Sequence, residues 1–181
     1  FAGERQPLLL GEPEPWIAFL LQALALDQRG SAAEAAALRG QSFEAAPTSA
    51  FLLNGAQRAD WLADADSRFG PMFEACLSGK YYWIPFNRVL EISIEPPADL
   101  RDLVWLPATI VFEGGGEEVA FLPVRYPGSE RTDDEAIKRA RRTEWLPLAG
   151  DYVRGIGQHM WTSGDDDFAL LDVRSAKRIV E

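Results

Sequence analysis

Cysteine and histidine are almost absent from this 181-residue sequence, which contains one of each. Cys76 has no second cysteine with which to form an internal disulfide, and its apolar neighbours indicate a small buried residue. A zinc site made of histidine and cysteine would have one nitrogen and one sulfur ligand. A serine nucleophile would have His159 as its sole imidazole base, and the glycine-flanked context RGIGQHMW favours a structural, hydrogen-bonding role for that histidine.

Positive charge is also scarce, because 18 Lys and Arg residues face 28 Asp and Glu residues for a formal net charge of −10. Such a chain repels phosphate backbones, and its one dense basic segment, KRARR at 138–142, follows the acidic residues DDE. No apolar run reaches the roughly 18 residues that span a bilayer, and the start lacks the basic-then-apolar order of a signal peptide. We expect a cytoplasmic protein that binds neither nucleic acid nor membrane.

The first 48 residues show helical periodicity. Apolar residues recur at helical spacing over 15–29, Gly30 ends this pattern, and an alanine-rich helix is expected from there to Pro47. Ser31 and Glu34 have the spacing of a capping box at the start of the second helix. The sequence predicts a helical hairpin with a loose likeness to a tetratricopeptide unit. Because the chain begins at Phe1 without methionine, we expect it to be a fragment of a longer protein.

From residue 50 the pattern becomes strand-like. Asn54-Gly55 is a hairpin-turn candidate, and short strands are expected at 72–77, 81–86, 89–95, 108–113 and 117–124. Residues 133–142 are expected to form one short helix and 167–174 a closing strand. We therefore predict an α+β fold, with a helical hairpin at 1–48 packed on a β-rich domain at 49–181. The sheet is expected to be antiparallel and curved, or a partly closed barrel.

The segment WLADADSRFGP, residues 61–71, resembles the start of a calcium loop in its two aspartates, Asp64 and Asp66. The remaining calcium positions are occupied by residues that cannot serve, including Arg68 where an oxygen ligand is required. We predict instead a structural corner that joins strands, in which the aspartates make turn hydrogen bonds, Arg68 pairs with a carboxylate, and Gly70-Pro71 ends the turn. No metal or cofactor is expected.

Two other segments fail as cofactor sites. The glycine run FEGGGEE places glutamates where a phosphate would lie, and RGIGQ lacks the third glycine of a dinucleotide site. Asp165, Asp166 and Asp167 are adjacent, which is typical of a solvated turn. The alternative to a non-enzymatic protein is a small hydrolase or metal-dependent enzyme that uses Asp64, Asp66 and His159.

Aromatic and arginine residues are abundant, and interfaces favour both kinds. Strand alternation in YYWIPF cannot bury Tyr81, Tyr82 and Trp83 on a single face. We therefore hypothesise a partner-binding surface, by a helix in a groove or by a strand added to a sheet edge, drawn from Trp61, Arg68, Tyr81, Tyr82, Trp83 and Arg125.

A series of segments keeps its order and spacing along the chain: FAGERQPLLLGEPEPW, WLADADSRFGPMFE, GKYYWIPFNRV, PPADLRDLVWLPA, RYPGSE, RRTEWLP and GIGQHMWTSGDDDFALLDVR. Together they resemble the ImpE family, also called SciE-like or TagJ, an accessory component of bacterial type VI secretion. The departures are small: His159 stands where the family often has a positive residue, and AFLLNGAQRADW is less glycine-rich than usual.

The resemblance implies that a helical, tetratricopeptide-like region precedes Phe1 in the complete protein. It also implies a non-enzymatic cytoplasmic adaptor that binds the small sheath subunit, of the TssB or VipA type. Such adaptors are expected to influence how the ClpV-type AAA+ ATPase handles the sheath.

Overall fold

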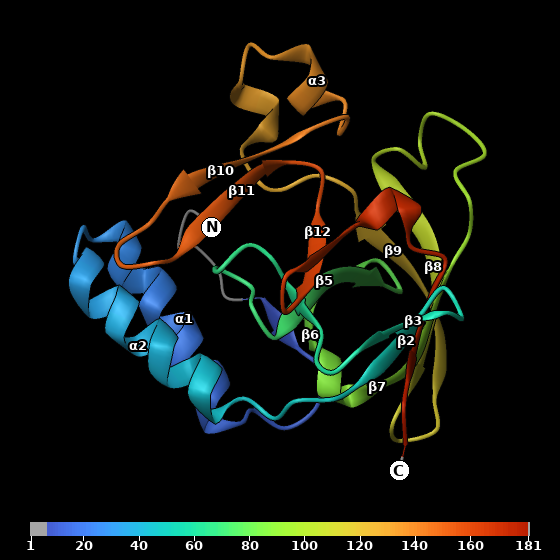
Figure 1. Cartoon of the computed structure of the whole chain (residues 1–181), viewed down its shortest axis with the longest axis horizontal. Coiled ribbons are helices and arrows are strands. Elements are labelled where there is room, and N and C mark those ends of the chain that lie inside the picture. Colours follow the sequence, from blue (N-terminus) through green and yellow to red (C-terminus); the bar gives the residue numbers. More distant parts are fainter. Residues whose placement is uncertain (1–6, 181) are drawn as a thin grey trace.

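The computed structural model describes residues 7–180 and joins a pair of helices to an extended sheet (Figure 1). Helix α1 (Pro15–Gln28) and helix α2 (Ala32–Ala45) lie side by side, and Gly30, with φ +78°, reverses the chain between them. The mixed α+β class is confirmed, and both helices lie where the sequence predicts helices. In the described part of the chain, no helix is long and apolar enough to cross a membrane.

Buried polar contacts fasten the two helices to each other and to the rest of the chain. The Arg39 side chain forms an ion pair with Asp27 at 2.5 Å, and its Nε donates to the Ser67 carbonyl at 2.9 Å. Ser42 Oγ donates to the carbonyl of Trp16 at 2.7 Å. The predicted capping box is wrong, because Ser31 is the N-cap of α2 but its side chain makes no capping hydrogen bond.

The main sheet has nine strands in an open arrangement. Apart from the parallel pair formed by β1 and β6, its neighbouring strands are antiparallel. No sheet among residues 7–180 closes, so of the two forms expected, an antiparallel sheet or a partly closed barrel, the structure has the open sheet. In spatial order the strands are β1 (Leu8–Leu9), β6 (Lys80–Pro85), β5 (Met72–Leu77), β9 (Glu117–Pro123), β8 (Trp105–Phe112), β7 (Val89–Ile94), β14 (Ser175–Arg178), β2 (Phe51–Leu53) and β3 (Gln57–Ala59).

Several of these strands match the sequence prediction closely. The 72–77 strand has the predicted bounds, and Asn54-Gly55 forms the turn between β2 and β3 with positive φ at both residues. β1 is an unpredicted strand that precedes the helices and pairs with β6. The segment before residue 48 therefore contributes to the sheet as well as the helices.

Two smaller sheets lie beside the main one. β10 (Thr143–Pro147) pairs with β11 (Val153–Gly157), while β12 (Met160–Ser163) lies between β13 (Asp166–Ala169) and β4 (Ala63–Asp64). The chain also forms the 3-10 turns Phe86–Arg88, Ser129–Arg131 and Leu170–Asp172.

Two predicted elements in the C-terminal half need correction. The helix expected at 133–142 is a single turn, α3 (Glu135–Lys138), capped by Asp134. The closing strand expected at 167–174 divides into the end of β13 and a 3-10 turn, and the strand that closes the main sheet is β14. A 3-10 turn cannot continue the ladder, so pairing resumes only after it.

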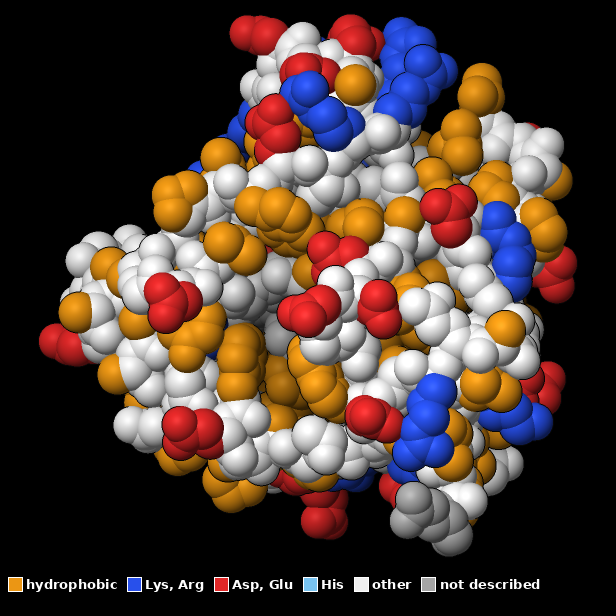
Figure 2. All heavy atoms as spheres, viewed as in Figure 1, with side chains coloured by type: hydrophobic (Ala, Val, Ile, Leu, Met, Phe, Trp, Pro, Cys, Tyr) orange, Lys and Arg blue, Asp and Glu red, His pale blue; other side chains and the backbone are white. Residues whose placement is uncertain are grey.

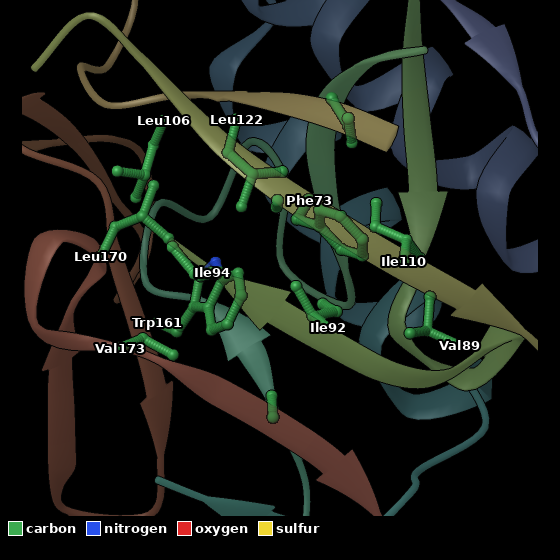
Figure 3. Close-up of a cluster of buried hydrophobic side chains, with 14 of the residues drawn as sticks. Phe73, Val89, Ile92, Ile94, Leu106, Ile110, Leu122, Trp161, Leu170 and Val173 are labelled. Atoms are coloured by element: carbon green, nitrogen blue, oxygen red, sulfur yellow. The ribbon is translucent and has the colours of Figure 1, made fainter. Parts of the chain in front are cut away.

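The core lies between the main sheet and the segments folded over it (Figure 3). Alternate residues of the strands point inward, and Trp161 from β12 packs on them with Leu170 and Val173. A second apolar cluster joins α1 to the sheet through Trp16, Ile17, Leu20, Phe69, Met72, Trp83 and Tyr126. Cys76 is half-buried rather than buried as predicted, because its face of β5 is only partly covered.

Candidate functional site

The segment 63–71 folds as a tight corner held by its own aspartates. Asp64 Oδ1 accepts the backbone N–H of Asp66 at 2.9 Å, and Asp66 Oδ1 accepts that of Arg68 at 2.8 Å. Asp66 also forms a buried fork with the Arg68 guanidinium, and its Oδ2 accepts the Gly155 N–H at 2.8 Å. Each short carboxylate thus satisfies backbone donors of the turn that follows it.

Gly70 allows the corner to close against helix α2. Its φ of +52° lies in the left-handed region, and a Cβ on this residue would overlap the Phe43 ring. The Gly70 carbonyl accepts the Asp64 N–H at 2.7 Å, which closes the loop, and Pro71 follows directly. The requirement for glycine therefore has two causes, one in the backbone and one in the packing.

A buried polar network begins at this corner and crosses to the main sheet. His159 lies between two carboxylates, with Nδ1 2.8 Å from Asp64 Oδ2 and Nε2 3.0 Å from Glu74 Oε1. The Tyr126 hydroxyl donates to Asp64 Oδ1 at 2.8 Å, and the Tyr81 hydroxyl donates to Glu74 Oε2. Through the ring of His159, which lies between β11 and β12, the network connects β4, β5 and β6.

The two carboxylates hold His159 in its charged form. Burial acts to lower the pKa of His159, but the Asp64 charge and the hydrogen bonds that the ring donates to Asp64 and Glu74 outweigh burial and raise the pKa to about 10. Burial raises the pKa of Asp64, and the neighbouring imidazolium opposes that rise. Burial also raises the pKa of Tyr126 well above its usual value. At neutral pH both ring nitrogens of His159 therefore donate.

This arrangement does not suit catalysis. His159 is 2% exposed and has both nitrogens engaged, so neither can take a proton from a substrate. The structure brings Asp64 and His159 together, but Asp66 is committed to Arg68. Within residues 7–180, no group of three or more His, Cys, Asp or Glu side chains is placed to hold a metal ion.

A cleft of about 370 Å³ opens on the outer side of the corner. Its walls come from three places: Phe43 at the end of α2, the connection through Pro47, and the corner with Trp61 and Pro71. Figure 2 shows a hollow with hydrophobic walls between the helices and the centre of the molecule. Trp61 is 37% exposed, so its indole is available at the cleft.

The residues hypothesised to bind a partner do not form one surface. Arg68 and Trp83 are buried, so both are wrong as surface anchors: Arg68 pairs with Asp66, and Trp83 packs in the second apolar cluster against α1. Tyr82 points to the opposite face of β6 and packs on the main core. The other three divide between two sites, since Trp61 lines the cleft while Tyr81 and Arg125 line a shallower one of about 320 Å³.

Sequence reasoning missed three residues of this region. Glu74 is the one charged residue in the apolar strand β5, and that isolation was a signal that it has a buried partner. Tyr126 lies in the segment RYPGSE, and its bond to Asp64 joins residues 62 apart in sequence. Phe43 carried no signal beyond the helical pattern.

The sequence of this chain matches a known protein family. A profile of the ImpE protein family matches residues 56–177, which is more than half of the chain and includes the corner and the polar network. The chain belongs to the ImpE family. The resemblance in the sequence is thus confirmed.

A curated relative extends the match. The type VI secretion system accessory component TagJ of Pseudomonas aeruginosa is 44% identical over 174 residues, which are 96% of this chain and 60% of that protein. The chain therefore spans about 60% of the length of this relative. The name of the relative describes an accessory component, in agreement with the prediction of a non-enzymatic role.

The ImpE fold also has a solved counterpart. A crystal structure of a protein from Vibrio parahaemolyticus superposes with a TM-score of 0.89 at 23% identity. The match covers 99% of this chain and 67% of that one. At this identity the likeness shows the fold alone.

Proposed function

We propose that this ImpE-family chain acts in the cytoplasm as a non-enzymatic accessory component of a type VI secretion system. In this role it docks a segment of the small sheath subunit, of the TssB or VipA type. Family membership and the name of the curated relative support the accessory role. The full engagement of His159 and Asp66 supports a role without catalysis.

The cleft beside Trp61 is the observation that carries the docking proposal. It is concave and mainly apolar, and it presents an exposed tryptophan, the residue type most enriched at interface hot spots. The side chain of a docked segment would contact Trp61 and Phe43. A sheath segment held in the cleft is shielded from other partners, and in this way docking would influence handling by the ClpV-type ATPase.

Titration of labelled peptides that span the small sheath subunit tests this proposal. We expect Trp61→Ala to weaken binding of the responsive peptide by about 1–4 kcal/mol, because the anchor is truncated. Trp145→Ala is the matched control, since Trp145 is also 37% exposed but lies on β10, outside the cleft.

The same titration is made with an extended chain that has the length of the curated relative. Affinity that appears only with the extended chain, or equal losses from the two tryptophan variants, would contradict docking in the cleft.

A further inference from the structure

The walls of the cleft are held in place by packing on one side and by hydrogen bonds on the other. The Phe43 ring packs edge-on against Tyr152, with ring centroids 5.7 Å apart, and it lies directly over Gly70. The corner opposite is held by the Asp64 and Asp66 turn bonds and by the bond from Arg39 to the Ser67 carbonyl. Both walls are therefore ordered before any ligand arrives, which lowers the entropy lost on binding.

Exposed acidic residues lie close in the chain to residues that line the cleft: Glu44 follows Phe43, and Asp165–Asp167 belong to the hairpin that contains Thr162. We call these four residues the rim. No Lys or Arg is present among the described residues that line the cleft, and Asp64 lies at its floor. Asp167 is the cross-strand partner of Thr162. Acidic side chains surround the hollow in Figure 2.

The rim charge is uncompensated within the part of the chain that the structure describes. Asp60, next to Trp61, pairs with Arg58 at 2.9 Å. In contrast, Glu44, Asp165, Asp166 and Asp167 form no ion pair with any other residue of the range 7–180. A ligand with positive charge beside its apolar anchor would meet these carboxylates, whereas an anionic ligand would be repelled.

We propose that the cleft binds a protein segment in which an aliphatic or aromatic side chain is flanked by lysine or arginine. The anchor enters between Phe43 and Trp61, and the flanking cations lie against the rim carboxylates of Glu44 and Asp165–Asp167. This inference rests on the proposed docking function and specifies the chemistry of the segment. The charges are solvated, so they act mainly on the association rate and on selectivity.

A charge-neutral rim tests the inference with the sheath peptide that responds to Trp61→Ala. The variant is Glu44→Gln with Asp165→Asn, Asp166→Asn and Asp167→Asn. At low salt we expect it to weaken binding about five- to tenfold and to flatten the salt dependence, as for the loss of steering charges. The control removes the same number of exposed acidic charges elsewhere, at Glu95, Glu117, Glu118 and Asp133, and should bind like the parent chain.

The two proposals fail in different ways in this experiment. If Trp61→Ala weakens binding but the neutral rim leaves affinity and salt dependence unchanged, the inference about charge is overturned and docking in the cleft stands. If no sheath peptide responds to Trp61→Ala, the docking function fails.

Small probes then examine the chemistry of the cleft by itself. NMR titration with 3-phenylpropylammonium is expected to shift the Trp61 indole N–H and the amides of residues 63–65, while 3-phenylpropionate at the same concentrations leaves them in place. Equal shifts from both probes, larger shifts from the anion, or shifts from neither would overturn the inference.

Discussion

The apolar core under the main sheet and the polar corner beside the cleft are both buried, but different forces hold them. In the core, burial of residues such as Ile92 and Phe73 stabilises the fold roughly in proportion to area, with little demand on direction. At the corner, the buried polar network of Asp64, Glu74 and His159 stabilises the fold only while all three residues keep their partners. The core should therefore tolerate small losses that the corner does not.

The largest loss of unfolding free energy is expected when His159 is replaced by leucine. Asp64 and Glu74 would then keep their burial but lose the cation between them, at a cost of about 3–5 kcal/mol of unfolding free energy. Urea denaturation measures this loss. Adding Asp64→Asn and Glu74→Gln to His159→Leu removes the unpaired charges and should restore part of the stability; if the triple variant is no more stable than His159→Leu, charge pairing is not the cause.

Raising the pH should weaken the same network without any mutation. His159 has a folded pKa of about 10, above its unfolded value near 6.5, so its stabilisation is complete below pH 6.5 and declines as the pH rises toward 10. Unfolding free energies measured from pH 6.5 to 9.5 are expected to fall for the parent chain. His159→Gln should lack this slope, and an unchanged slope in that variant would show that other groups produce it.

Gly70→Ala should have a smaller effect than the loss of His159, because it strains the corner without leaving a buried charge. The positive φ costs about 1–2 kcal/mol and overlap with Phe43 about 1–3 kcal/mol more. Gly79→Ala is the matched control, since Gly79 has φ +76° but open space where a Cβ would lie. If thermal unfolding gives equal losses for the two variants, contact with Phe43 contributes nothing.

The smallest effect belongs to the core. Ile92→Val removes one buried methylene group and should cost about 0.5–1.5 kcal/mol. The loss in unfolding free energy should be the same at pH 6.5 and pH 9.5, because the substitution replaces one uncharged side chain with another. A pH-dependent loss in this variant would erase the distinction between core and corner.

Local patterns in the sequence were sufficient for much of the fold. The strand at 72–77 and the Asn54-Gly55 turn follow from alternation and turn chemistry, which act between neighbouring residues. The pairing of β10 with β11 was missed, because TEWLP and VRGIG carry little alternation and depend on surrounding contacts. β1, with two paired residues, is too short to give a signal.

The site was harder to predict because its partners are distant in sequence. The pairing of Arg68 with a carboxylate could be anticipated, and Asp66 lies only two residues away. The bonds of His159 reach across 95 residues to Asp64 and 85 to Glu74, and no single segment contains that information. The burial of Trp83 likewise depends on α1, which covers its face of β6.

The two edges of the main sheet also bear on whether another strand can pair with it. In the described range, one edge is β1, with two residues, and the other is β3, with three, and its Gln57 and Arg58 are exposed. Short edges with polar side chains offer few backbone groups to an incoming strand, and they protect a sheet from edge-to-edge aggregation. The same edges disfavour recognition by strand addition, so a partner is expected to bind this protein through its side chains. They also offer few free backbone groups from which an amyloid-like sheet could grow.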